Sequence, residues 1–199
     1  DSKDSELTGL AQQIMEQTDR TSKILQSLVN FAHAGNNKLM HENERFLISE
    51  CIAQAQTLVS LDKKNNDMQL EIDCDPEAAI LGDSQRLLQV LINLINNARD
   101  ASQEGGTIVL AAKNMGTHIN ISVTDFGIGI PNAIKSRVFD PFFTTKEAGE
   151  GTGLGLSLVL SIVEDLNGNI DIISPVDRAR GTGTQVLLKF PCYDPLSQG

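Results

Sequence analysis

Four stretches of the chain place apolar residues at helical spacing. In the first, from Leu7 to Phe31, apolar residues recur every three or four positions, and only Gln17 and Thr21 interrupt them. This spacing is typical of the seam of a coiled coil or helical bundle, and it equally fits an amphipathic helix that packs on its own domain. The other three predicted helices are Leu47–Val59, the stretch from Asp83 as N-cap to about Ala101, and Leu154–Leu166.

Short runs that alternate apolar with polar residues predict the strands, because alternation is typical of half-buried sheet. The runs are Met68–Ile72, Ala78–Leu81, Thr107–Ala112, His118–Thr124, Ile170–Ile173 and Thr184–Phe190. The order of elements lacks the strict strand and helix alternation of a doubly wound fold. We therefore expect an α/β (α+β) two-layer sandwich, with a mixed, mainly antiparallel sheet covered on one face by three helices and preceded by one long coiled-coil-like helix.

Turn-forming residues between these patterns suggest the domain boundaries. The segment from Ala34 to Arg45 contains Gly35, Asn36 and Asn37 and has no apolar period, so it is the best candidate for a linker. We predict a partial helical domain over residues 1–34, a linker over 35–45, one globular domain over 46–191 and a polar tail over 192–199. Because the chain begins at Asp1, we interpret it as a fragment of a longer protein.

Composition excludes several classes of function. The 199 residues are 40% hydrophobic and 21% charged, which is enough apolar material for one sizeable core. A net charge of -10 disfavours binding to nucleic acid or to an anionic membrane. The three cysteines lie far apart without metal-ligand spacing, so we expect reduced thiols and no structural metal. The sequence shows no apolar run long enough to cross a bilayer.

Two polar motifs stand out against the apolar background. Asn93 and Asn97 are four residues apart, so both amides project from one face of a helix that is otherwise apolar. They suit contacts to phosphate oxygens or Mg²⁺, although buried amides bonded to backbone give the same pattern.

The motif Asp125-x-Gly127-x-Gly129 follows a predicted strand. Its carboxylate can accept a hydrogen bond from the amino group of adenine, and its glycines let a base approach the backbone, but a plain turn also fits.

A glycine-studded loop precedes the last predicted helix. Its glycines are Gly149, Gly151, Gly153 and Gly155. The free amides and the dipole of the helix that follows can point at phosphates, which is how an acidic protein can hold a nucleotide, while a merely flexible loop is the alternative. No Gly-Lys-Ser/Thr follows the loop and no strand precedes it, so neither a Walker motif nor a dinucleotide fingerprint fits.

The long loop before these glycines is a candidate lid. The segment from Phe139 to Gly151 has no period, and a loop of that length in a compact domain is usually functional. Aromatic residues make up only 4% of the chain, yet three of them, Phe139, Phe142 and Phe143, lie here, so we expect them to anchor a lid. Lys146 can neutralise terminal phosphates, or it is an ordinary solvated lysine.

In this order the motifs resemble the catalytic, ATP-binding core of the sensor histidine kinases of two-component systems. That core belongs to an ATPase group that includes gyrase, MutL and the ninety-kilodalton heat-shock chaperones. The resemblance rests on Asn93-x-x-x-Asn97-Ala98, on the stretch from Val123 to Pro131, and on Gly151-Thr-Gly-Leu-Gly-Leu-Ser157. Gly181-Thr-Gly-Thr184 resembles the closing element near adenine.

The resemblance implies a Bergerat-type ATP-binding fold over residues 46–191, with ATP and Mg²⁺ as cofactors and Asn97 as the metal ligand. The implied nucleotide-binding residues are Asn93, Asn97, Asp125, Gly127, Gly129, Lys146, Gly151, Thr152, Gly153, Leu154, Gly155, Leu156 and Thr184. Residues 1–34 resemble the second helix of the dimerisation hairpin, whose first helix would precede Asp1. The expected partners are ATP or ADP, a response-regulator receiver domain and a second copy bound through the dimerisation helices, without nucleic acid or direct membrane contact.

By the same resemblance, the domain transfers the γ-phosphate of ATP to a histidine for relay to a response-regulator aspartate. His33 lacks both the acid and the proline that would mark this histidine, and His118 alternates outward on a predicted strand. His41 is followed by the acid Glu42, but it lies in the predicted linker and lacks the downstream proline. We therefore expect the acceptor outside the chain, in a cytoplasmic part of a parent protein. The alternatives are an ATP-hydrolysing switch of the gyrase or MutL type and a nucleotide-gated interaction module. Asn93 favours the kinase, since hydrolysing relatives carry a water-activating Glu at that position. Asp100, in contrast, resembles the Asp that follows the Asn-Ala pair in those relatives.

Overall fold

The computed structural model describes residues 44–61, 68–147 and 151–192, with scattered positions between 9 and 25. Those scattered positions are helical and exposed, and the rest of the predicted seam lies outside the described residues. Most of the predicted linker and nearly all of the predicted tail also lie outside them. None of the helices in the described part has the length and the apolar content needed to span a membrane.

A five-stranded sheet forms one layer of the domain. Its spatial order is β2 (Gln69–Cys74), β4 (Thr107–Asn114), β5 (His118–Asp125), β7 (Thr184–Pro191) and β6 (Asn169–Ile173). Strands β2 and β4 run parallel and every other neighbouring pair is antiparallel. The prediction of a mixed, mainly antiparallel sheet is confirmed, and β5 lies at its centre.

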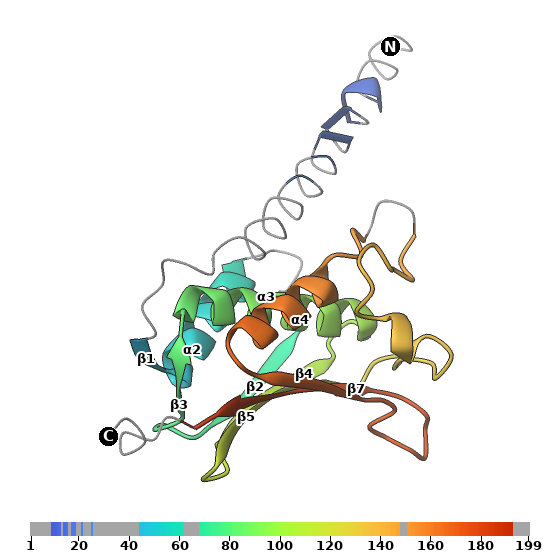
Figure 1. Ribbon diagram of the computed structural model, residues 1–199. Helices are drawn as coiled ribbons and strands as arrows, with labels where there is room; N and C mark the ends of the chain where they lie inside the picture. The colour runs from blue at the N-terminus through green and yellow to red at the C-terminus, as the bar shows by residue number, and fades with distance from the viewer. Residues whose placement is uncertain are drawn as a thin grey trace.

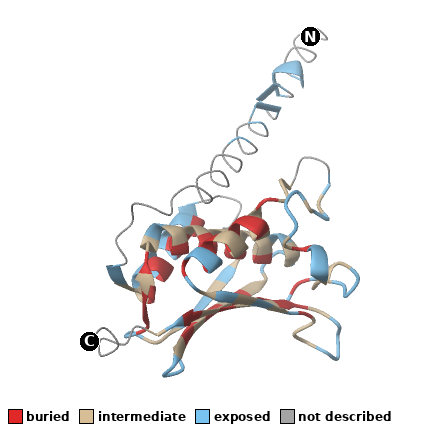
Figure 2. Cartoon of the chain, in the orientation of Figure 1, coloured by how far each residue is buried: buried red, intermediate tan, exposed pale blue. Residues whose placement is uncertain are grey.

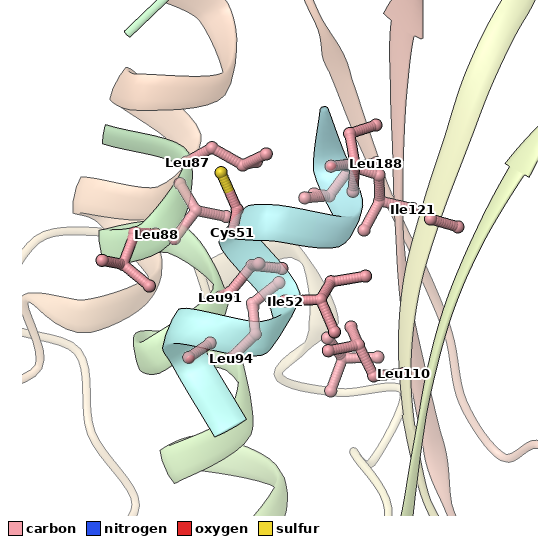
Figure 3. Packing of buried hydrophobic residues seen from close by; sticks show 14 of the residues in the cluster. Cys51, Ile52, Leu87, Leu88, Leu91, Leu94, Leu110, Ile121 and Leu188 are labelled. Atoms are coloured by element: carbon pink, nitrogen blue, oxygen red, sulfur yellow. The ribbon is translucent and has the colours of Figure 1, made fainter. Parts of the chain in front are cut away.

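Helices α2 (Ile48–Leu61), α3 (Ser84–Ala101) and α4 (Gly155–Asp165) form the other layer, on one face of the sheet (Figure 1). The core lies between the layers, where Figure 2 shows the buried residues. In Figure 3, Cys51 of α2 lies beside Leu87 of α3, while Ile52 faces Leu110 and Ile121 of the sheet. The predicted two-layer sandwich is therefore confirmed for the described residues.

Helix α3 is fixed at both ends by local hydrogen bonds. The side chain of Asp83 accepts a hydrogen bond of 2.8 Å from the amide of Gln85, which confirms Asp83 as the N-cap. At the other end, the hydroxyl of Ser102 donates to the carbonyl of Ala98 at 2.7 Å. Between these caps, seven apolar side chains are buried, more than in α2 or α4.

The thiol of Cys51 belongs to this core. It is 2% exposed, and burial raises its pKa to about 11, with the charges of Glu50 and Asp83 adding to the effect. All three cysteines lie among the described residues, and no disulfide joins them. The expectation of reduced thiols is consistent with this arrangement.

Two elements of the domain differ from the prediction. Strand β1 (Glu44–Leu47) pairs antiparallel with β3 (Ala79–Gly82), whereas the sequence analysis placed a linker up to Arg45 and started a helix at Leu47. Four residues are too few to show alternation, and β1 is specified by its partner strand instead. A 3₁₀ turn at Lys135–Arg137, which is not among the predicted elements, follows Pro131.

The burial of α3 predicts a large effect of truncating its core face. Leu91 is fully buried, so Leu91→Ala should lower the free energy of unfolding by about 2–5 kcal/mol through lost burial and a residual cavity. Gln85→Ala, on the exposed surface of the same helix, should change it by about 0.5 kcal/mol or less. Urea denaturation of both variants measures the difference, and equal losses would contradict the described packing.

Candidate functional site

One cavity of about 630 Å³ brings distant segments together. Its walls are α3, the stretch from Ile128 to Val138, the stretch from Phe143 to Lys146, and the start of α4. The predicted residues that line it are Asn93, Asn97, Gly129, Lys146, Gly151, Thr152, Gly153, Gly155 and Leu156. Asp125, Gly127, Leu154 and Thr184 are not among the lining residues, so the structure gathers nine of the thirteen at the cavity surface.

The two asparagines of α3 point at the start of α4. Asn93 donates from Nδ2 to the backbone carbonyl of Gln89 at 3.0 Å, which leaves its Oδ1 for other contacts. A Cβ on Gly155 would lie 3.5 Å from Asn93 Oδ1 and 3.8 Å from Asn97 Nδ2. The Asn97 side chain makes no hydrogen bond to any residue that the structure describes. Both polar ends are therefore available to a ligand at the α4 terminus.

The N-terminus of α4 has the features of an anion site. The first residues of the helix, Gly155 and Leu156, line the cavity, and the N-cap residue Leu154 provides no side-chain cap. The hydroxyl of Thr152 accepts a hydrogen bond from the Leu154 amide at 3.3 Å, which shapes the loop just before the helix. Uncapped first-turn amides and the positive end of the helix dipole favour a phosphate at this position.

Glycine is required where the lid meets this terminus. Gly153 has φ +66°, and a Cβ there would lie 2.3 Å from the carbonyl carbon of Phe142. A Cβ on Gly151 would lie 2.6 Å from the Thr144 hydroxyl. The backbone of the lid thus packs directly on the glycine-rich loop, and side chains at these two positions would push the two segments apart.

Asp125 is the last residue of the central strand β5. It is 5% exposed, and Oδ1 accepts hydrogen bonds from the amides of Gly127 (3.0 Å) and Thr184 (3.3 Å). No hydrogen bond from the described residues reaches Oδ2. Burial raises the pKa of this carboxyl above its ordinary value, and the two backbone hydrogen bonds oppose the shift only in part.

The turn that follows Asp125 packs against the end of α3. A Cβ on Gly127 would lie 2.0 Å from the carbonyl oxygen of Ala101, and the amide of Ile128 donates to the same carbonyl at 3.0 Å. Only glycine fits such an approach. Gly129 lines the cavity, and its predicted role of bringing backbone close to a ligand stays a prediction. Gly127 serves the contact with α3.

Lys146 is engaged in an ion pair at the cavity wall. Its Nζ lies 2.5 Å from Asp100 Oδ2, and Asp100 Oδ1 also accepts from Nε and Nη2 of Arg99 at 2.9 and 2.7 Å. Burial raises the pKa of the Asp100 carboxyl, but the hydrogen bonds from Lys146 and Arg99 outweigh burial and leave the pKa below its ordinary value. The sequence analysis named neither this pair nor Asp100 as part of the site, because partners 46 residues apart leave no local pattern.

The expectation that three aromatics anchor the lid is wrong for Phe142. That side chain is 66% exposed and its backbone has φ 67°, because the Phe142 backbone is the part that rests on Gly153. Phe143 does line the cavity, and its ring centroid lies 4.6 Å from the guanidinium carbon of Arg137. Phe139 is half-buried.

Sequence analysis missed the apolar wall and one buried hydroxyl. Ile128, Ile130, Ile134 and Val138 line the cavity although their spacing has no period, so only the folded loop reveals them. The Ser174 hydroxyl, 5% exposed, accepts a hydrogen bond from the amide of Ile130 at 2.7 Å. An apolar wall opposite amides and an uncapped helix suits a ligand with a flat apolar end and an anionic end.

Comparison with known proteins identifies the family. The family profile described as "Histidine kinase-, DNA gyrase B-, and HSP90-like ATPase" matches residues 82–194, which include both asparagines and every glycine motif. This chain belongs to that family. The resemblance proposed from the motifs is therefore confirmed, and the domain is a histidine-kinase type ATP-binding domain.

Individual relatives give the same result. The sensor histidine kinase ZraS of Escherichia coli K12 is 35% identical over 183 residues, which is 92% of this chain and 37% of ZraS. Sporulation kinase B of Bacillus subtilis is 30% identical over 183 residues, which is 92% of this chain and 40% of that kinase. The chain thus spans well under half the length of these curated relatives.

Solved structures show the same architecture. The catalytic domain of the histidine kinase ThkA, in a nucleotide-free form, superposes with a TM-score of 0.66 at 31% identity and covers 76% of this chain and 96% of that one. ThkA in complex with the response regulator protein TrrA gives a TM-score of 0.70 at 27% identity, covering 90% of this chain and 49% of that one. The fold described above is thus the fold of histidine kinase catalytic domains.

The raised pKa of Asp125 predicts a stability cost that depends on pH. A carboxyl whose pKa is higher in the folded state than in the unfolded state destabilises the fold once it is ionised, and this cost disappears as pH falls below the unfolded value. Asp125→Asn removes the charge but keeps an oxygen that can accept from Gly127 and Thr184. We expect the nucleotide-free variant to unfold at higher urea than wild type near pH 7, with the difference shrinking toward about pH 4. A less stable variant at neutral pH would contradict the burial argument.

Proposed function

We propose that this chain is the ATP-binding catalytic core of a sensor histidine kinase, which binds Mg-ATP and transfers the γ-phosphate to a histidine outside the chain. The observation that carries the proposal is the convergence of Asn93 and Asn97 on the uncapped terminus of α4, within 3.5 and 3.8 Å of the Cβ position of Gly155. This places amide dipoles and a helix dipole around one point, as a phosphate group requires.

The two ends of the cavity match the two ends of ATP. The adenine ring would lie against the apolar wall near Ile130, with its amino group donating to the unoccupied Oδ2 of Asp125. The phosphates would then extend toward Leu156 at the start of α4. Family membership and the distribution of apolar and polar residues support this orientation.

Asn97 is the residue that fits the metal. Mg²⁺ prefers oxygen ligands and in nucleotide sites takes few of them from protein, the rest coming from phosphates and water. The Asn97 side chain has no hydrogen-bond partner among the described residues, so its amide oxygen can turn toward a cation. The described residues contain no cluster of His, Cys, Asp and Glu that would hold a metal without the nucleotide. Mg²⁺ would supply neutralisation of phosphate charge.

Proton chemistry at the cavity favours transfer over hydrolysis. Among the described residues that line it, Asp100 is the one carboxylate, and its ion pairs with Lys146 and Arg99 hold its pKa low, which makes it a poor general base for water. Asn93 has no basicity at all. The domain would therefore act by positioning ATP and shielding its charge, as phosphoryl transfer to an external acceptor requires.

We extend the proposal to the partners of the longer protein. Residues 1–34 would supply one helix of a dimerisation hairpin, and the phosphoacceptor histidine would precede Asp1. A receiver domain would take the phosphoryl group onto an aspartate, by analogy with ThkA, which has been solved with the response regulator TrrA. His118 is the only histidine among the described residues; it lies on β5, and its Nδ1 is 2.9 Å from the hydroxyl of Thr117.

Nucleotide binding is the first test. Isothermal titration with Mg-ATP should give saturable binding to wild type, and Asp125→Asn should weaken it about tenfold or more, because one charge-assisted hydrogen bond to adenine is lost. The same variant should be the more stable one without nucleotide.

Phosphoryl transfer is the second test. Labelled γ-phosphate should pass to an added upstream hairpin helix that carries a histidine, whereas rapid phosphate release without that helix would indicate an ATPase.

A further prediction concerns the ion pair at the lid. If Lys146 reaches the terminal phosphate, Lys146→Met should weaken ATP about five- to tenfold while changing ADP affinity little. Asp100→Asn should strengthen ATP binding, because Lys146 then has no ion pair with a carboxylate to break before it contacts the phosphate. Lys113→Met is the matched control, because Lys113 pairs with Asp73 and Asp75 away from the cavity. Equal effects on ATP and ADP would place Lys146 elsewhere than at the third phosphate.

A further inference from the structure

Ser174 is a buried hydroxyl that joins segments behind the cavity without lining it. Its Oγ accepts from the amide of Ile130 at 2.7 Å and donates to the carbonyl of Gly183 at 2.9 Å. Gly129, at φ +73°, packs so closely that a Cβ there would lie 3.1 Å from the same oxygen. One hydroxyl thus bonds the loop after β5 to the turn before β7.

The same two segments hold the buried carboxylate. The amide of Gly183 donates to the carbonyl of Gly127 at 2.8 Å. Asp125 Oδ1 in turn accepts from the amides of Gly127 and Thr184. The position of the carboxylate therefore depends on the spacing between the loop after β5 and the turn before β7. Ser174 holds that spacing through its hydrogen bonds to Ile130 and Gly183.

A third segment is attached at the same residue. Nζ of Lys135, from the 3₁₀ turn that follows Pro131, donates to the backbone carbonyl of Ser174. Lys135 lies next to Ile134, which lines the cavity. Ser174 therefore connects three segments: the loop after β5, the turn before β7 and the 3₁₀ turn next to the apolar wall of the cavity.

We propose that Ser174 is a positioning residue for the nucleotide. Its hydroxyl preforms the loop from Gly127 to Ile130, so that the apolar wall and Asp125 stand in the geometry that receives adenine. This inference rests on the proposed function, and Ser174 itself does not touch the ligand.

Removing the hydroxyl should lower nucleotide affinity by changing the loop conformations that the nucleotide-free protein populates. In Ser174→Ala the amide of Ile130 loses its acceptor, and the loop populates conformations that cannot receive the base. The apparent dissociation constant rises by the inverse of the competent fraction, so a fraction near one tenth gives a loss of about tenfold. Because the loop contacts the base and not the phosphates, ATP and ADP should lose affinity by the same factor.

The experiment measures the dissociation constants of Mg-ATP and Mg-ADP by isothermal titration, well below the melting temperature. The stability control is Ile162→Val, which shortens a fully buried side chain of α4 that does not line the cavity. We expect Ser174→Ala to weaken both nucleotides about equally and Ile162→Val to weaken neither. Equal affinities in Ser174→Ala and wild type would overturn the positioning role, and so would a loss confined to ATP.

Wild-type protein provides a second measurement and separates the two proposals. Without nucleotide, the amide of Ile130 should exchange its hydrogen more slowly than the exposed amide of Thr145 in the lid, because Ser174 protects it. Equal exchange rates would overturn the inference even if Ser174→Ala fails to fold. If wild type binds no nucleotide, the proposed function fails. If it binds and Ser174→Ala binds as well, only the role of Ser174 fails.

Discussion

The contact between α3 and α4 is the interaction on which the cavity depends. Helix α3 buries seven apolar side chains against the sheet and its neighbours, and this fixes the direction of its remaining polar face. Helix α4 begins where that face is polar, so that a Cβ on Gly155 would lie in ordinary contact with Asn93 Oδ1, at 3.5 Å. Apolar packing therefore sets the distance between the asparagine amides and the dipole of α4.

This arrangement explains how a chain with a net charge of -10 can present an anion site. Long-range electrostatics oppose the approach of a polyanion, so the attraction has to come from groups within a few ångströms. Amide dipoles and a helix terminus meet this need because they add no net charge. Lys146 is a local cation whose charge Asp100 already balances, so it adds attraction only if the pair opens.

Much of the fold and part of the site follow from the sequence. Helix α3 was predicted with its N-cap because Asp83 and an apolar period over several turns are local signals. Strand β1 was missed because its identity comes from pairing with β3, and Ser174 was missed because its partners lie 9 and 44 residues away. Phe142 was assigned to the wrong environment because composition shows that an aromatic is present and not which of its atoms makes the contact.

The glycine motifs could be found because close backbone contacts exclude any other residue at some of their positions. Gly127 and Gly153 each meet another backbone at a distance that excludes a Cβ, so their spacing in the chain carries three-dimensional information. The pairing of Lys146 with Asp100 carries none, since either residue alone is ordinary on a protein surface. Sequence patterns therefore identified the frame of the site better than its ion pairs.

The close contact between the backbones of Phe142 and Gly153 affects how the loop between them can change in length. The two residues form the neck of a loop, because the chain leaves and re-enters the domain at nearly the same point. The entropy of closing such a loop rises only slowly with its length. Residues added between these positions would therefore cost little closure entropy, but Phe143, Lys146 and Thr152 line the cavity, so such an insertion would alter the cavity wall itself.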